Sequence, residues 1–294
     1  MSPATASAAS SLYMVRPATP ADRAAIRRLL GHSWRVYLPV GSQWLDRCLG
    51  AGECWVMMEG GREVAGIMAV LKRHPEVASI VGAAVRNGLP TSLYVGMALP
   101  YLETYGRRQR VRGLACLSGA AWLSETLSAQ GFQTREHVIT YGWDAKPLAV
   151  AGNSAVTVEP VRYDDLETIV AIDRQIFAPV WHKPQAEMEY TLGRANYFVA
   201  AKHENRIVGY CWSEQEGTHA HLTRLGVAED WQGKGIGTRL LTEALVEMMR
   251  AGVTWVTLNT QASNWRARRL YEYYGFRRVG QAMPLLWKDL EGLS

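Results

Sequence analysis

This 294-residue sequence contains little cysteine and no long apolar run. Its four cysteines, Cys48, Cys54, Cys116 and Cys211, are far apart and form no Cys-x-x-Cys pair. The sequence therefore offers neither a zinc ribbon nor a disulfide framework, and it is typical of a reducing compartment. No stretch reaches the ~18 apolar residues of a membrane-spanning helix, and the first residues lack the features of a signal peptide. We expect a cytoplasmic protein with no membrane partner.

The charge is unevenly distributed along the chain. The net charge is +5, and the excess lies in residues 1–145, with 15 Lys+Arg against 10 Asp+Glu, whereas the remainder has 17 of each. Four arginines cluster at Arg107, Arg108, Arg110 and Arg112. Such a cluster could face nucleic acid, but cations also suit the C-terminal end of a helix. We favour the helix end and keep a nucleic-acid-associated role as the last alternative.

The length suits two domains, each large enough to bury a core. A small, aperiodic segment at Lys146–Ala155 predicts the linker between them. The predicted organisation is an Ala/Ser-rich disordered tail over 1–12, a first domain over 13–145, the linker over 146–155 and a second domain over 156–290. Nothing in the sequence distinguishes a monomer from a homodimer.

The two halves repeat one another weakly. Residues 13–30 and 156–173 both predict a strand, a turn and a helix, and residues 54–73 and 196–212 both predict hairpins, with turns at Gly60-Gly61 and Glu204-Asn205. A helix closed by Gly-Phe ends each half, at Gly131-Phe132 and Gly275-Phe276. The fold class is therefore a mixed α/β (α+β) sheet sandwich used twice.

The most specific stretch is a glycine-rich turn between a strand and a helix. The strand His221–Val227 contains Gly226, which predicts a bulge or a close backbone approach. It leads through Gln232–Thr238 into a helix whose amino end would bind a pyrophosphate. The order of glycines and lysine fits neither a P-loop nor a dinucleotide-binding turn.

This turn resembles motif A of the GNAT superfamily of acetyl-CoA-dependent N-acetyltransferases. The match is Gln232-x-x-Gly235-x-Gly237 after a strand that ends at Val227, and the resemblance covers most of residues 155–290. It implies acetyl-CoA as cosubstrate, pantetheine along Leu225–Val227, and the pyrophosphate on the amides of Gly233–Thr238. The implied cofactor-binding residues are Leu225, Gly226, Val227, Gln232, Gly233, Lys234, Gly235, Ile236, Gly237, Thr238 and Asn264.

A second stretch is similar to motif B of the same superfamily, with the spacing Asn264-x-x-Ala-x-x-Leu-Tyr271-x-x-x-Gly-Phe276. The resemblance implies that Asn264 contacts the CoA arm and that Tyr271 gives a proton to the leaving thiolate. A phenol of pKa about 10 is a reasonable acid for a thiolate of pKa about 8.5. Without the resemblance, Asn264 would be read as a helix cap and Tyr271 as a packing residue.

The general base is less defined. Peptide N-terminal acetyltransferases of this superfamily often carry a Glu five residues before the motif B Asn, where this chain has Asn259. His221, eleven residues before Gln232, stands where other members carry a His or Glu and is the candidate base, with an ordinary strand histidine as the alternative. His219 shares its strand face, but no third ligand is near, so we expect no metal.

These patterns together predict an N-acetyltransferase acting on a primary amine of a small molecule or peptide. Aromatic content and family geometry place the acceptor near Phe177, Trp181 and Tyr190. The first half is expected to be a degenerate GNAT repeat, because Ala120 and Leu127 stand opposite Asn264 and Tyr271 and the glycine turn is missing. The alternative from a different class is a non-catalytic acyl-CoA- or CoA-binding module, which Asn259 favours.

Overall fold

The computed structural model describes residues 12–38, 43–146 and 150–290. Nearly all of the predicted tail, and residues 147–149 of the predicted linker, lie outside this part of the chain. The chain divides into two compact units. Unit 1 comprises Met1–Arg135 and Met283–Ser294, and unit 2 comprises Glu136–Ala282.

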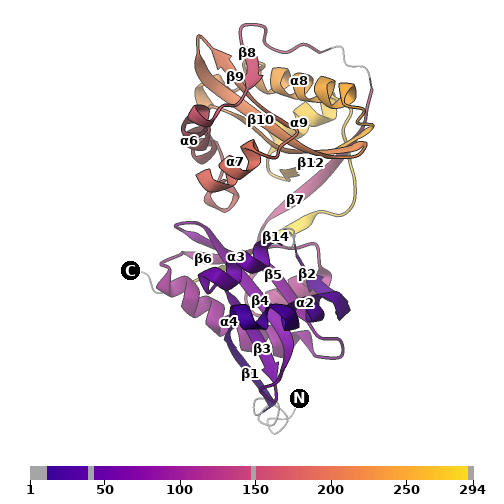
Figure 1. Ribbon diagram of the computed structural model, residues 1–294. Coiled ribbons are helices and arrows are strands. Elements are labelled where there is room, and N and C mark those ends of the chain that lie inside the picture. The colour runs from indigo at the N-terminus through magenta and orange to yellow at the C-terminus, as the bar shows by residue number, and fades with distance from the viewer. Residues whose placement is uncertain (1–11, 39–42, 147–149, 291–294) are drawn as a thin grey trace. The chain divides into compact units, whose positions relative to one another are not determined.

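Unit 1 is a mixed sheet with helices on both faces (Figure 1). Its strand order is β1-β3-β4-β5-β6-β14, and β2 pairs with β5. The strands are β1 (Tyr13–Pro17), β2 (Arg35–Tyr37), β3 (Cys54–Glu59), β4 (Glu63–His74), β5 (Val77–Val85), β6 (Gly113–Leu117) and β14 (Met283–Asp289). The helices are α2 (Arg23–His32), α3 (Gln43–Ala51), α4 (Thr91–Arg108) and α5 (Ala121–Ala129).

Unit 2 has the same plan, with the strand order β7-β12-β11-β10-β9-β8 and with β13 paired to β7 (Figure 1). The strands are β7 (Gln133–Asp144), β8 (Thr157–Pro160), β9 (Tyr197–His203), β10 (Arg206–Glu216), β11 (His219–Val227), β12 (Trp255–Gln261) and β13 (Arg277–Arg278). The helices are α6 (Leu166–Ile176), α7 (Gln185–Leu192), α8 (Ile236–Arg250) and α9 (Trp265–Tyr273).

Each sheet buries one apolar layer on each face. In unit 2, Leu240 and Leu245 of α8 pack with Cys211 of β10, whereas Ile169 of α6 packs with Tyr210 and the other face of the same strand. Successive strand residues point to opposite faces, so β10 serves both layers and is buried continuously from Ile207 to Ser213. In unit 1, α2 and α3 cover one face, and α4 and α5 cover the other.

The last strand of each half belongs to the other unit, which differs from the predicted domain boundaries. Residues 136–144 of β7 belong to unit 2, where β7 pairs with β12 and Trp143 stacks on Phe276. Strand β14 belongs to unit 1, where it pairs with β6 and buries Leu286. The halves therefore exchange their last strands. Either strand offers an apolar face of the same kind, so the local pattern does not tell which sheet it completes.

The expected turns form as predicted. Gly60 and Gly61 connect β3 to β4 with positive φ, and Glu204 and Asn205 do the same between β9 and β10. Gly131 and Gly275 adopt the left-handed conformation after α5 and α9. The amides of Phe132 and Phe276 bond back to the carbonyls of Leu127 and Tyr271, which closes both helices in the same way.

The arginine cluster lies at the C-terminal end of α4, as the simpler interpretation expects. Arg107 pairs with Glu103 in the helix, and Arg112 lies within 3.5 Å of Glu76. No helix in the described part of the chain is both long and apolar enough to cross a membrane.

Candidate active site

Unit 2 opens where two neighbouring parallel strands separate. β11 pairs with β12 only from His219–Trp255 to Leu222–Leu258. The next residue, Thr223, is skipped in the ladder between β10 and β11, so the bulge lies there. Beyond it, the free edge of β11 faces a cleft. For Gly226 the sequence left open a bulge or a close backbone approach, and the structure shows the close approach: a Cβ there would lie 2.7 Å from the ring of Tyr210.

The glycine loop leads directly into α8. Gly233 and Gly235 have φ angles of 74° and 75°, which favour glycine, and α8 begins at Ile236. The side chain of Asn153 donates to the carbonyl of Lys234 at 2.7 Å, and its backbone amide donates to Gly235. Since the first amides of a helix have no carbonyl one turn earlier, this end of α8 presents free donors and the positive end of the dipole.

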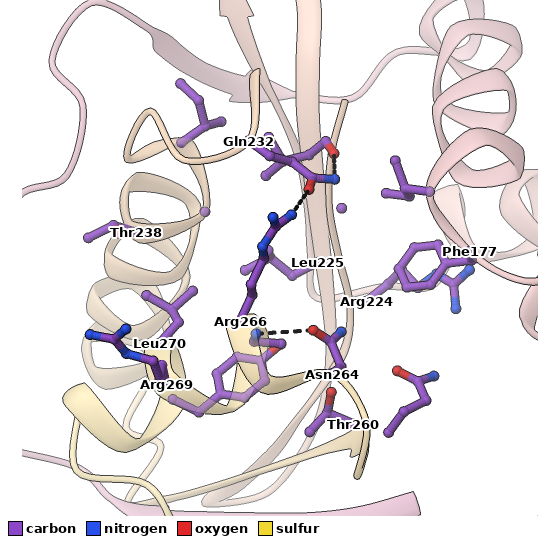
Figure 2. Close-up of a pocket in the computed structure, with 18 of the residues that line it drawn as sticks. Phe177, Arg224, Leu225, Gln232, Thr238, Thr260, Asn264, Arg266, Arg269 and Leu270 are labelled. Carbon is purple, nitrogen blue, oxygen red and sulfur yellow. Dashed lines mark hydrogen bonds between the residues drawn. The ribbon is translucent and has the colours of Figure 1, made fainter. Parts of the chain in front are cut away.

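The separated strands, the loop and α9 enclose one cleft of about 1000 Å³ (Figure 2). Most of the predicted cofactor residues line it: Leu225, Gly226, Val227, Gln232, Gly233, Gly235, Ile236, Gly237, Thr238 and Asn264. Tyr271 and Phe177 line it as well. Four predicted residues do not line it, namely His221, Lys234, Trp181 and Tyr190.

Helix α9 supplies one wall of the cleft. Asn264 caps it, because its side-chain oxygen accepts a hydrogen bond from the amide of Ala267 at 3.1 Å (Figure 2). Tyr271 is only 7% exposed and packs against Tyr141 and Phe276. Burial raises the pKa of Tyr271 above its usual value of 10, so the phenol stays protonated at neutral pH.

The same helix brings two arginines that the sequence analysis overlooked. Arg266 and Arg269 line the cleft, and Nη1 of Arg266 lies 3.3 Å from Oε1 of Gln232 (Figure 2). The amide nitrogen of Gln232 in turn donates to the carbonyl of Val227 at 3.1 Å. This chain of bonds ties α9 to the glycine loop, and the arginines make the region suitable for phosphate groups. Their spacing of three residues on a predicted helix was the available signal.

At the opposite side of the cleft, Arg224 follows the bulge residue and stacks on the ring of Phe177, 3.5 Å from its centroid (Figure 2). Its guanidinium donates to the fully buried carboxylate of Asp173 and to the carbonyl of Trp181. The hydroxyl of Tyr210 donates to the same carboxylate, and burial raises the pKa of Tyr210. This network fixes the position of Phe177. No pattern in the local sequence predicted the network.

The predicted residues outside the cleft have other surroundings. Nδ1 of His221 lies 2.8 Å from Oγ1 of Thr257, and desolvation lowers the pKa of His221, although Glu214 opposes this shift. The ammonium of Lys234 lies over the ring of Trp231. Tyr190 is half exposed, and the guanidinium of Arg194 lies over its ring. Asn259 lines the cleft and accepts a hydrogen bond from Thr140.

The lining of the cleft fits a CoA thioester. The free strand edge can pair with an amide-containing arm, and the glycines of the loop leave room for phosphates beside the amides of α8. No group of three potential metal ligands occurs among the described residues.

The sheet of unit 2 is split at a bulge, and a glycine loop lies at the split. Comparison with known proteins identifies the class of protein that has this architecture. The model of the Acetyltransferase (GNAT) family matches residues 166–276. The N-alpha-acetyltransferase RimI of Mycobacterium tuberculosis is 30% identical over 135 residues, which are 44% of this chain and 84% of that protein. The chain belongs to the GNAT family of acetyltransferases.

Other similar proteins extend over both units. A mycothiol acetyltransferase of Propionibacterium freudenreichii is 24% identical over 246 residues, 76% of this chain and 74% of that protein. A tandem GNAT protein from the clavulanic acid biosynthesis pathway has a TM-score of 0.67 at 16% identity and covers 96% of this chain and 100% of its own. This fold similarity supports the tandem arrangement, in which the first repeat lacks the glycine turn.

Proposed function

We propose that unit 2 transfers an acetyl group from acetyl-CoA to a primary amine. The observation that carries this proposal is the convergence in one cleft of the free β11 edge, the glycine loop and the phenol of Tyr271. The reaction has three requirements, and each feature would supply one of them. The strand edge would hold the thioester, the loop would bind its phosphates, and the phenol would protonate its leaving group.

The amides of Gly233–Thr238 would bind the pyrophosphate, with Arg266 and Arg269 adding positive charge. The edge of β11 near Val227 would pair with the pantetheine arm. An amide there that is free of the β12 ladder would also polarise the thioester carbonyl, a contribution worth about 3 kcal/mol for one donor.

In the chemical step, the amine nitrogen forms a bond to the acetyl carbon and the carbon–sulfur bond breaks. Tyr271 gives its proton to the departing thiolate, and its raised pKa means that the phenol still holds this proton when the thiolate forms. The nitrogen must lose one proton as the amide forms. Asn259 cannot receive it, and we assign this role to His221 acting through water.

His221 is suited to this role by its hydrogen bonds. Nδ1 of His221 lies 2.8 Å from Thr257 Oγ1, and this oxygen lies 3.5 Å from the carbonyl of Ala220. In the tautomer with the proton on Nδ1, the ring donates to Thr257 and Nε2 keeps the lone pair that a base needs. Thr257 is two residues from the cleft-lining Asn259, a separation of about 7 Å along the strand. A proton would therefore travel through one or two water molecules.

The acceptor would enter beside Phe177 and Arg224, the residues that line the end of the cleft nearest α6. One named relative is an N-alpha-acetyltransferase and the other a mycothiol acetyltransferase, so their names point to different kinds of acceptor. We therefore propose a small-molecule or peptide amine.

Release of free thiol from acetyl-CoA, measured against a panel of peptide and small-molecule amines, tests the proposal. We expect at least one amine to accelerate release well above hydrolysis and to gain 42 Da, about the mass of an acetyl group less one hydrogen. Tight acetyl-CoA binding with slow hydrolysis that no amine accelerates would instead assign a non-catalytic binding module.

A further inference from the structure

Strand β5 of unit 1 is built like β11 of unit 2. The ladder between β4 and β5 skips Val81, as the ladder between β10 and β11 skips Thr223. β5 also pairs with β6 in parallel only as far as Ser79, shortly before its bulge. Unit 1 therefore has the same parting of strands that opens the cleft in unit 2.

Counting residues from each bulge identifies the part of unit 1 that corresponds to Leu225–Val227, the strand edge proposed to bind pantetheine. Ala83–Val85 of unit 1 take the places of Leu225–Val227 in unit 2. One edge of Ala83–Val85 is already paired with β4, through Met68, Ile67 and Gly66. Because a strand has only two edges, the other one is the counterpart of the edge that lines the cleft of unit 2.

In unit 1 this edge is occupied by the chain itself. Strand β2 pairs antiparallel with it, with Arg35 opposite Val85, Val36 opposite Ala84 and Tyr37 opposite Ala83. The hydroxyl of Tyr37 donates to the carbonyl of Leu117 at 2.6 Å, at the end of β6. A segment of main chain therefore lies where the proposed function of unit 2 would place pantetheine.

The loop that takes the place of the glycine turn holds the same segment. It spans residues 86–90 between β5 and α4, whereas residues 228–235 connect β11 to α8. The amide nitrogen of the Asn87 side chain donates to the carbonyl of His32 at 2.8 Å, and its oxygen accepts from the amide of Trp34 at 3.0 Å. Arg35 also donates to the carbonyl of Leu89 at 3.2 Å.

We propose that residues 32–37, here called the strap, are an internal occupant of the acyl-CoA groove of unit 1. The strap satisfies the edge of β5 and ties down the loop, so unit 1 keeps the fold while its groove is closed. The protein then has a single acetyl-CoA site per chain, in unit 2. This inference concerns unit 1 and uses the proposed function only to name the ligand that the strap replaces.

Hydrogen exchange followed by mass spectrometry on the full chain, with and without acetyl-CoA, tests the strap. Peptides covering 83–85 should be equally protected from exchange in both conditions, because β2 already forms hydrogen bonds along the edge of β5 that faces away from β4. Peptides covering 225–227 should gain protection only with acetyl-CoA. Protection of 83–85 that rises on adding acetyl-CoA, or fast exchange there without it, would overturn the inference.

Two variants release the strap without touching unit 2. Asn87→Ala and Tyr37→Phe should each speed exchange at 83–85 by about tenfold, the effect of losing roughly 1.4 kcal/mol of local protection. Tyr101→Phe, at a half-exposed tyrosine of α4, is the matched control and should leave this exchange unchanged. Unchanged exchange in both release variants contradicts the strap.

Equilibrium dialysis with acetyl-CoA adds an independent readout. One molecule bound per chain is expected, and two per chain would overturn the inference while leaving the proposed function intact. If no acetyl-CoA binds, the proposed function fails, and the exchange rates at 83–85 without ligand still decide whether the strap holds its groove closed.

Discussion

Arg224 and Asp173, 51 residues apart in the chain, form an ion pair in which Nη2 lies 2.6 Å from a fully buried carboxylate oxygen. Arg224 is itself nine-tenths buried and stacks on Phe177. The pair therefore joins α6 to β11 at the end of the cleft that Phe177 lines, so its integrity controls the geometry of this end of the cleft.

Breaking this pair should be costly. Asp173→Ala leaves a buried guanidinium without its partner, and we expect a loss of about 3–5 kcal/mol in the free energy of unfolding, measured with urea. Glu247→Ala is the control, because its pair with Arg250 is exposed and should contribute less than about 1 kcal/mol. Equal effects of the two substitutions would show that the buried pair is not important for stability.

Tyr271→Phe tests the proton donor. The substitution removes only the hydroxyl, so we expect kcat to fall by about 10²–10⁴ while the Kd for acetyl-CoA changes by less than about twofold. Tyr273→Phe, at an exposed position of the same helix, should leave both constants unchanged. Full turnover by Tyr271→Phe on an identified amine would remove Tyr271 from the mechanism.

Gly235→Ala tests the phosphate loop. A Cβ at its φ of 75° adds strain of about 1 kcal/mol or more and shifts the neighbouring amides, so acetyl-CoA should bind about tenfold more weakly. Gly217→Ala, in the turn between β10 and β11, adds a Cβ at a φ of 59° with open space around it. By calorimetric titration the control should lose stability but not affinity, and a matching loss of affinity would contradict the role of the loop.

Asn264 allows capping to be separated from ligand binding. Asn264→Asp keeps an oxygen that can accept from the amide of Ala267, whereas Asn264→Ala loses it and should cost about 1 kcal/mol of stability. If the side-chain amide also donates to the CoA arm, both variants should bind acetyl-CoA more weakly. Normal affinity in Asn264→Asp would restrict this residue to its capping role.

The pH dependence of kcat/KM tests His221. Its pKa is lowered by desolvation, so the ring is neutral above about pH 6.5, and the proposed base is lost only as the pH falls below that value. We expect a flat profile near neutrality with an acidic limb below pH 6.5. The raised pKa of Tyr271 predicts no loss of the acid near neutrality. In His221→Gln the acidic limb should disappear along with most of the activity, and an unchanged limb would assign it to another group.

Protonation of His221 at low pH should also lower the stability of the folded protein. Because the folded-state pKa is lower than the unfolded value, its contribution is fully present above about pH 6.5 and is lost as the pH falls through the folded-state pKa. His221→Gln should therefore show a weaker decrease of Tm between about pH 6.5 and 5 than the unaltered chain. A parallel decrease in both proteins would mean that other groups dominate acid unfolding.

The sequence by itself determined the features that depend on neighbours along the chain. The glycines with positive φ in the phosphate loop, the cap at Asn264 and the turn at Gly60-Gly61 are local requirements of the backbone, so residue types and spacing suffice to place them. The family resemblance carried by Gln232–Thr238 and Asn264–Phe276 then predicted the cleft that these elements form.

Only the tertiary structure decided which distant partners meet. The sequence left open whether Gly226 marks a bulge or a close approach, and only the register with β10 places the bulge at Thr223. The pairing of Arg224 with Asp173 and the exchange of β7 and β14 between the units depend on packing that many sequences could satisfy. The strap at 32–37 also has no local signature, since a three-residue strand is recognisable only by the open edge of β5 that it fills.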